Sequence, residues 1–261
     1  MSSGASVRLE RDDGLAIVTF HSPPLNLFDE AMGQGLADVI DQLEATPARA
    51  VLLRAEGRVF SAGVDVSVFA AQESVEQACS TFDELVELAR RVDRLPCPTV
   101  LAAHALCLTW AFELALACDL ILAAESARFG LVERVIGLTP AMGGTQRLAE
   151  RAGTGRAREL VMTARPYDAA ALERWNVVNL VLPDDGFDAA VRKLATELAD
   201  GPTLAHAATK QVLREYLDGG VERANDRVAQ IAAELFDTED LRAAVATFLK
   251  EGPGKASFRG R

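Results

Sequence analysis

The longest apolar stretch of this chain, from Pro98 to Ala124, constrains its fold more than any other feature. It reads PTVLAAHALCLTWAFELALACDLILAA and is long enough to span a bilayer. It also contains Glu113 and Asp119, and each acid would cost about 3 kcal/mol at the centre of a membrane helix. We therefore expect no membrane span, but a buried extended PTVLAAHALCL, a helical WAFELALA and an extended CDLILAAES.

Strand and helix patterns alternate before this stretch. Residues 15–20 (LAIVTF) and 50–57 (AVLLRAEG) have the composition of buried strands. Asp29 is placed to cap a helix that runs to about Glu44, and a second helical pattern runs from Val75 to Leu95. Such alternation is typical of an α/β fold with crossover connections.

The last third of the chain reads as helix after Gly143, apart from a strand-like VVNLVL at 177–182. We expect an α/β core over residues 1–195 and a helical region over 196–261, packed against the core or against another subunit. The candidate helices are 144–151, 156–162, 168–174, 187–199, 203–217, 221–235 and 238–249.

Charge and cysteine usage limit the partners and the compartment. The chain has 38 acidic and 27 basic residues, a net charge of −11, which argues against a nucleic-acid or anionic-membrane partner. Its four cysteines show no Cys-x-x-Cys spacing, so buried free thiols in a reducing compartment are expected. Met1–Val7 lacks the pattern of a secretory signal, and we expect a cytoplasmic protein.

Common catalytic motifs are absent from the sequence. The three histidines, His21, His104 and His206, have no metal-binding spacing, so no metal is expected. There is no P-loop, no GxGxxG after a strand and no GxSxG elbow. The most frequent kinase, dehydrogenase and hydrolase chemistries are therefore not favoured.

Two acids stand out by context. Burial of Glu113 in WAFELALAC would raise its pKa and suit a general acid or base; alternatively, helix N-terminal amides or an arginine satisfy it. Glu133 lies between FGLV and RVIGL, where an acid is usually a cap or a solvated charge. Two carboxyl groups at one cavity could add water across a polarised double bond.

Two glycine-containing turns could contribute backbone groups. FSAGVD, residues 60–65, follows a buried strand and could present amide N–H groups to an oxyanion, or be an ordinary strand-to-helix turn. MGGTQRL, residues 142–148, opens a helix with a glycine pair, which permits either close approach to a ligand or tight helix packing.

These segments, in this order and spacing, resemble the crotonase (enoyl-CoA hydratase/isomerase) family. The matching text comprises FSAGVDVSVF, the segment from PTVLAAHALCL to MGGTQRL, and FLKEGPGKASFRGR at the C-terminus. The resemblance implies a spiral core of ββα turns and a C-terminal helical trimerisation region, often in a dimer of trimers. It also implies a CoA thioester substrate, with no metal or separate cofactor because coenzyme A is part of the substrate.

The resemblance also assigns roles to particular residues. Val64 and Trp110 match the two backbone N–H donors of the oxyanion hole, and Glu113 and Glu133 match the two glutamates that hydratases keep. It thus implies an enoyl-CoA hydratase that converts a trans-2-enoyl-CoA to a 3-hydroxyacyl-CoA. The positions expected to contact substrate or CoA are Leu25, Ala62, Gly63, Asp65, Val66, Pro140, Gly143, Phe248 and Lys255.

Two departures from the family pattern affect this expectation. Trp110 stands where relatives usually have glycine; it would be strained if φ is positive there, and its indole is expected either to enter the acyl tunnel or to block the hole. Ser67 stands where many relatives have a lysine for CoA phosphates. Basic clusters at 147–158 and 250–261, with Lys255 the first candidate, are expected to replace it.

Other activities remain open at this point. A Δ3,Δ2-enoyl-CoA isomerase can act with one acid, and a specialised acyl-CoA lyase is another member activity. A non-catalytic acyl-CoA binding protein would follow if Trp110 blocks the hole. A serine peptidase of the caseinolytic type shares the superfold, but Ser61 has no evident histidine partner in the matching segment.

Overall fold

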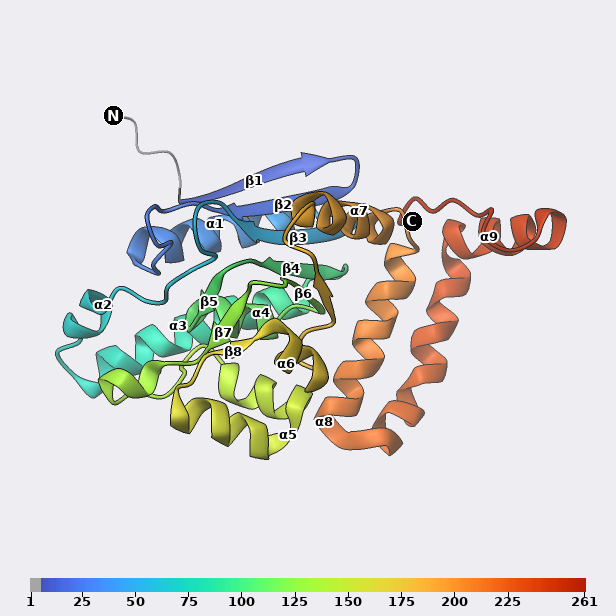
Figure 1. Ribbon diagram of the computed structural model, residues 1–261. Helices are drawn as coiled ribbons and strands as arrows, with labels where there is room; N and C mark the ends of the chain where they lie inside the picture. Colours follow the sequence, from blue (N-terminus) through green and yellow to red (C-terminus); the bar gives the residue numbers. More distant parts are fainter. Residues whose placement is uncertain (1–5) are drawn as a thin grey trace.

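A twisted sheet forms the centre of the molecule (Figure 1). The structure, a computed structural model, describes residues 6–261. Within them the sheet has the order β1-β2-β3-β4-β6-β9; β1 pairs with β2 antiparallel and every other neighbouring pair is parallel. Its strands are β1 (Val7–Asp12), β2 (Leu15–Phe20), β3 (Ala50–Ala55), β4 (Thr99–Ala103), β6 (Leu120–Ala124) and β9 (Leu180–Leu182).

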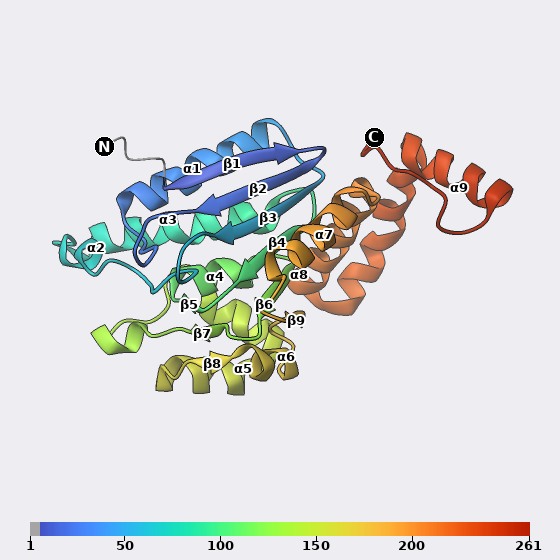
Figure 2. The ribbon, with the colours of Figure 1, turned by 45° about the horizontal axis from the view of Figure 1, so that its top comes forward.

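A second, smaller sheet lies beside the first (Figure 2). It consists of β5 (Leu106–Leu108), β7 (Arg128–Gly130) and β8 (Tyr167–Asp168), in the order β5-β7-β8. An isolated bridge between Ser61 and Cys107 joins the segment after β3 to this sheet. The chain therefore brings the 60–65 turn next to the segment that precedes the buried helix.

Helices cover both faces of the main sheet. Buried side chains of α1 and α3 pack with one face, including Val18, Val51 and Leu53, whereas α7 packs on the other face with Leu52 and Val100. The helices are α1 (Glu30–Ala45), α2 (Ser67–Ala70), α3 (Val75–Arg94), α4 (Trp110–Leu116), α5 (Gly144–Thr163), α6 (Ala169–Arg174), α7 (Phe187–Ala199), α8 (Thr203–Glu234) and α9 (Glu239–Glu251). Two 3-10 turns are η1 (Glu133–Ile136) and η2 (Leu235–Asp237).

The central apolar stretch forms the predicted strand, helix and strand. Pro98–Ala124 supplies β4, β5, α4 and β6, and all seven residues of α4 are buried. The predicted cap is also confirmed, since Asp29 Oδ1 accepts a hydrogen bond of 2.8 Å from the Met32 N–H. No helix within residues 6–261 has both the length and the hydropathy to cross a membrane.

Several element boundaries differ from the sequence prediction. The helices predicted at 144–151 and 156–162 form one element, α5, interrupted at Gly153, where φ is 82°. The helices predicted at 203–217 and 221–235 likewise form α8, interrupted at Gly219 and Gly220. The predicted strand at 177–182 is shorter, because regular pairing covers only β9. The sequence patterns do not predict the strands β1, β7 and β8.

The state of the cysteines and the N-terminal segment are the features behind the prediction of a reducing, cytoplasmic compartment. All four cysteines are free; Cys97, Cys107 and Cys118 are buried as expected, but Cys79 is exposed. Burial raises the pKa of the Cys97 thiol to about 11. The expectation that Met1–Val7 is no secretory signal rests mainly on residues 1–5, which lie outside the described residues.

The helices α8 and α9 form an arm that projects from the core (Figures 1 and 2). A partly buried ion pair anchors it: the buried Lys210 Nζ lies 2.7 Å from Oδ2 of the half-buried Asp119 and donates to the Cys97 carbonyl at 3.1 Å. Asp119 Oδ2 also accepts from the Thr99 N–H at 2.7 Å. The arm exposes large apolar side chains, namely Leu213, Tyr216, Leu217, Val221, Val228, Phe236, Val245, Phe248 and Leu249.

Candidate active site

Glu113 is buried in the first turn of α4 and is held by the start of α5. Its Oε2 accepts hydrogen bonds from the Met142 N–H at 2.8 Å and from the Gly144 N–H at 2.7 Å. A Cβ on Gly144 would lie 2.5 Å from Glu113 Cγ, so only glycine fits there. Gly144 of MGGTQRL therefore serves tight packing against Glu113, and N–H groups at the start of the helix bond the acid.

Opposing effects act on the pKa of Glu113. Burial raises the pKa above its ordinary value, whereas the N–H groups of Gly144, Met142 and Ala141 and the charge of Arg147 lower it. Burial is the largest of these effects. The hydrogen bonds nevertheless stabilise the ionised form, because an N–H donor at an anionic oxygen strengthens when the proton leaves.

Glu133 has surroundings of the opposite kind. It opens η1, is 7 % exposed, and neither Oε1 nor Oε2 has a hydrogen-bond partner among residues 6–261. Burial raises its pKa to about 7, and the negative charge of Glu113 contributes to this shift. Glu133 is thus neither a cap nor a solvated charge, and the two predicted carboxyl groups lie close enough to interact.

The turn that carries Val64 is fastened on two sides. Ser61 N–H donates to the Leu106 carbonyl at 2.9 Å, and the Ser61 carbonyl accepts from Leu108 at 3.1 Å. Phe28 bonds both flanks of Val64: its N–H donates to the Gly63 carbonyl and its carbonyl accepts from Asp65, each at 2.9 Å. Among the described residues Val64 N–H has no partner, as an oxyanion donor requires.

Trp110 supplies the first N–H of α4, which a helix leaves unpaired. The positive φ at this turn, 51°, belongs to Thr109 and not to Trp110, so the strain expected at Trp110 is not found. The indole is 2 % exposed and packs against Phe20 and Phe28, each ring centroid 5.3 Å away. The indole therefore lies in the aromatic core. It is found neither in an acyl tunnel nor across the oxyanion hole, the two positions expected from the sequence.

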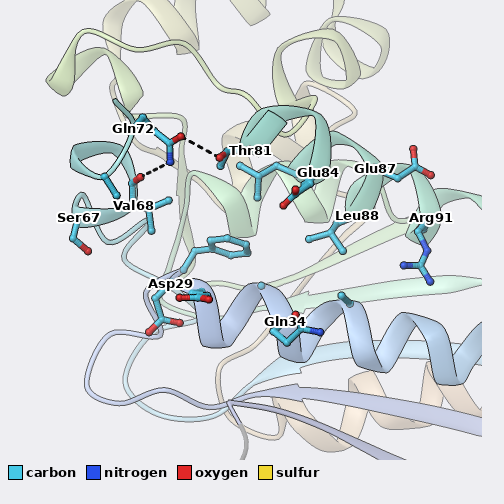
Figure 3. A pocket seen from close by; sticks show the side chains of 16 residues that line it. Asp29, Gln34, Ser67, Val68, Gln72, Thr81, Glu84, Glu87, Leu88 and Arg91 are labelled. Carbon is cyan, nitrogen blue, oxygen red and sulfur yellow. Dashed lines mark hydrogen bonds between the residues drawn. The ribbon is translucent and has the colours of Figure 1, made fainter. Parts of the chain in front are cut away.

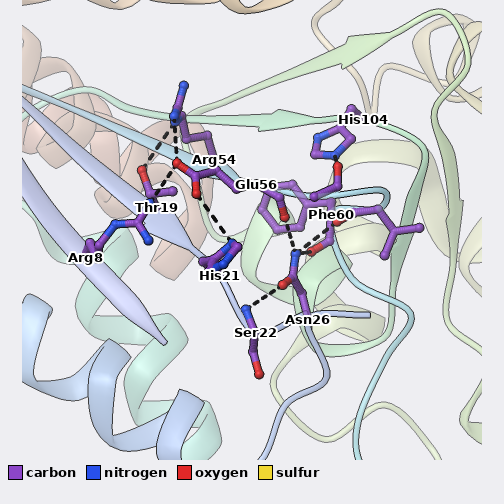
Figure 4. A network of polar contacts seen from close by, with 11 residues as sticks. Arg8, Thr19, His21, Ser22, Asn26, Arg54, Glu56, Phe60 and His104 are labelled. Atoms are coloured by element: carbon purple, nitrogen blue, oxygen red, sulfur yellow. Dashed lines mark hydrogen bonds and ion pairs between the residues drawn. The ribbon is translucent and has the colours of Figure 1, made fainter. Parts of the chain in front are cut away.

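Asn26 is a site-forming residue that the sequence reasoning missed (Figure 4). Its buried Nδ2 donates to the carbonyls of Glu56, Val59 and Phe60, at 2.8, 3.0 and 3.1 Å. Its Oδ1 accepts from the Ser22 N–H at 2.7 Å. One side chain thereby fixes the segment that leads into the Ser61 turn. The signal available in the sequence was a lone asparagine in the PPLN segment.

A cavity of about 810 Å³ lies between α1, α2 and α3 (Figure 3). Phe28, Val68, Leu85 and Leu88 give it apolar walls. Its carboxylate side chains are Asp29, Glu30, Glu84 and Glu87. Phe28 lines the cavity and is hydrogen-bonded to Gly63, so it connects the cavity to the Val64 turn, although neither Glu113 nor Glu133 lines the cavity.

Most positions predicted to contact substrate or CoA gather around these elements. Leu25, whose carbonyl accepts from Ala62 N–H at 2.9 Å, lies at the Val64 turn, as do Gly63, Asp65 and the exposed Val66. The loop before α5 that holds Glu113 contains the other two core positions, Pro140 and Gly143.

Phe248 and Lys255 are not brought to this region within one chain. They belong to α9 and the segment after it, at the far end of the molecule from α2 (Figures 1 and 2). The basic cluster at 147–158 is largely engaged internally: Arg151 donates to the Val177 carbonyl at 3.2 Å, and Arg156 lies 2.6 Å from Glu159. Contact of Lys255 with CoA phosphates stays a prediction.

Comparison with known proteins identifies the family. The family described as enoyl-CoA hydratase/isomerase matches residues 10–260. The chain is 28% identical to a probable enoyl-CoA hydratase of Bacillus subtilis (strain 168) over 98% of this chain and 99% of that one. It is also 28% identical to the mitochondrial Delta(3,5)-Delta(2,4)-dienoyl-CoA isomerase of Dictyostelium discoideum, over 94% and 89%.

A solved crystal structure matches the whole chain. It is that of a Streptomyces coelicolor A3(2) protein, provisionally assigned as an enoyl-CoA hydratase, with a TM-score of 0.92 and 31% identity over 100% of this chain and 98% of that one. The chain therefore belongs to the enoyl-CoA hydratase/isomerase (crotonase) family and adopts its mixed α/β fold with a C-terminal helical region.

Proposed function

We propose that this acyl-CoA enzyme of the crotonase family is an enoyl-CoA hydratase that adds water to a trans-2-enoyl-CoA thioester. The observation that carries the proposal is Glu133: a buried carboxyl group with no hydrogen-bond partner among the described residues, beside a second buried carboxyl group. Burying such a group without a partner is costly, so a use in chemistry explains it better than folding does.

The surroundings of the two acids give each a part in the reaction. Backbone N–H groups favour the ionised form of Glu113, which makes it the base that takes a proton from water as the hydroxyl adds to the β-carbon. Glu133, with its pKa near 7, retains a proton that it gives to the α-carbon. One water is consumed, and a proton returns from Glu113 to Glu133 between turnovers.

The backbone N–H groups of Val64 and Trp110 form the proposed oxyanion hole. Addition at the β-carbon places negative charge on the thioester oxygen, and two fixed N–H donors stabilise that enolate. The burial of the Trp110 indole supports an enzyme over the non-catalytic binder, because that alternative requires the indole to obstruct the hole.

The cavity beside Phe28 is proposed to take the acyl chain. Its apolar walls suit a hydrocarbon, whereas its four carboxylate side chains would repel the CoA phosphates. We propose that Phe248 and Lys255 reach the CoA of a neighbouring copy in a homotrimer or dimer of trimers. The exposed apolar side chains of α8 and α9 support such an assembly.

The test is a metal-free assay of trans-2-enoyl-CoA thioesters of several chain lengths, with 3-hydroxyacyl-CoA as the measured product. We expect product with at least one chain length. Tight CoA-ester binding without product at any length would overturn the proposal. Shift of a double bond without addition of water would instead assign an isomerase, the class of enzyme that the name of the Dictyostelium relative gives.

A further inference from the structure

We infer that Trp110 braces the oxyanion hole: its indole holds the turn that carries the other N–H donor. This inference rests on the proposed hole at Val64 and Trp110. Trp110 Nε1 donates to Ser61 Oγ at 2.8 Å, and both groups are buried. Trp110 thus supplies its own backbone N–H as one donor of the hole, and its side chain fixes the turn that carries the other donor, Val64.

The Ser61 hydroxyl is the centre of this brace. It accepts from Trp110 Nε1 and from the Gly63 N–H, at 2.8 and 3.0 Å, and it donates to the Asn26 carbonyl at 2.7 Å. A hydroxyl has one donor and two acceptor positions, so all of them are used. The orientation of the turn before Val64 is therefore set by a bond within the turn, from Gly63, and by two partners from separate segments of the chain, Trp110 and Asn26.

Thr109 closes the same turn from the other side. Its backbone has φ 51° and ψ −120°, a conformation that a β-branched residue rarely adopts. Thr109 Oγ1 would lie 3.2 Å from a Cβ on Gly63, so its side chain packs directly on the glycine. Thr109 and Trp110 together hold the Ser61–Gly63 turn between a hydrogen bond and a packing contact.

The brace matters because enolate stabilisation depends on donor position. Two N–H groups act together only when both lie within about 3 Å of the developing oxyanion. The indole is itself immobilised against Phe20, at 5.3 Å and an interplanar angle of 83°, so it can transmit this rigidity to Ser61. Trp110 is accordingly a positioning residue in addition to a backbone donor.

The experiment compares Trp110→Phe and Ser61→Ala with Trp175→Phe as a matched control. Phenylalanine at 110 keeps the aromatic packing and the backbone N–H but lacks the indole donor. We expect kcat for enoyl-CoA hydration to fall about tenfold to a hundredfold in each variant, with KM changed less than twofold. The double variant should lose no more than the worse single one, because both changes remove the same hydrogen bond. The control, whose ring faces Arg156, should keep full activity.

An infrared measurement of the bound thioester carbonyl separates the brace from a merely structural effect. Wild-type protein should shift the carbonyl stretch to lower frequency, and both variants should reduce that shift. Unchanged kcat and carbonyl shift in folded Trp110→Phe and Ser61→Ala would overturn the brace alone. Absence of hydration and of a carbonyl shift in the wild type would instead overturn the proposed function. Should Trp110→Phe fail to fold, Ser61→Ala decides.

Discussion

The two segments that hold the buried glutamates differ in their polar surroundings far more than in their burial. Glu113 and Glu133 are 3% and 7% exposed. Backbone N–H groups at the start of α5 donate to Glu113. The carboxyl group of Glu133, in η1, has no hydrogen-bond partner among the described residues. Similar burial therefore raises the pKa of both acids, but at Glu113 the N–H groups of Gly144, Met142 and Ala141 oppose the rise.

Removing either carboxyl group should have the largest effect. Glutamine keeps the shape of each side chain, but it can neither take a proton from water at 113 nor deliver one at 133. We expect Glu113→Gln and Glu133→Gln each to lower kcat for hydration by about 10²-fold to 10⁴-fold. Glu150→Gln on the exposed face of α5 is the control. Turnover near the wild-type rate in Glu133→Gln would show that the α-proton comes from elsewhere.

A side chain added at Gly144, where the helix backbone touches Glu113, tests the role of the N–H groups that bond this glutamate. A methyl group in Gly144→Ala would occupy the space 2.5 Å from Glu113 Cγ and displace the carboxylate. We expect kcat to fall by about 10²-fold, because misplacement of about 1 Å carries such a cost. Gly155→Ala in the same helix meets nothing within 4 Å and should leave kcat unchanged. Equal activity of the two variants would contradict the proposed role of the α5 N–H groups.

The unpartnered state of Glu133 should also lower stability in a pH-dependent way. Its folded pKa, about 7, lies above the ordinary 4.5, so the folded protein favours the neutral form. The resulting penalty is absent below pH 4.5, grows as pH rises, and is complete above pH 7. Glu133→Gln should therefore exceed the wild type by about 3 kcal/mol in unfolding free energy at pH 8 and match it at pH 4. Denaturant unfolding at the two pH values measures this, and an equal difference at both would contradict it.

The ionisation of Glu133 should also change the rate of hydration with pH, by a smaller factor than the substitutions above. Since the protonated form of Glu133 is the proposed acid, kcat should decline above about pH 7, approaching tenfold per pH unit. The residual activity of Glu133→Gln should lack this alkaline decline. A decline of the same midpoint in both proteins would assign it to another group.

Local patterns accounted for the elements with strong periodicity or clear caps. Asp29 and the apolar stripe behind it predicted α1, and α7 occupies the predicted residues 187–199. By contrast, β1 reads VRLERD and is an edge strand whose pairing with β2 compensates for its polar composition. The glycine breaks in α5 and α8 looked like helix ends because a local pattern does not show that the chain continues as helix beyond them.

Residue types and their spacing predict which residues form the site, but not the contacts that surround them. The apolar context of Glu113, together with the family resemblance, identified both acids. The contacts that distinguish them come from segments 29 or more residues away, such as Met142 and Gly144. The position of the Trp110 indole likewise depends on Phe20 and on Ser61, which lies 49 residues away. Such partners become neighbours only after the sheet has formed.

The ion pair of Lys210 and Asp119 has a consequence for how copies of this chain could meet. An ammonium group held by a carboxylate and a carbonyl has a preferred direction, whereas an apolar contact tolerates sliding. The pair therefore contributes to the angle at which α8 leaves the sheet, together with the hydrogen bonds from Arg49 to the Gly201 carbonyl and from Arg214 to the Asp93 carbonyl. The length of the arm multiplies any error in that angle at its far end. In a ring of identical subunits, this small set of polar contacts at the base of the arm would affect whether the arms meet their neighbours at the angle that closure requires.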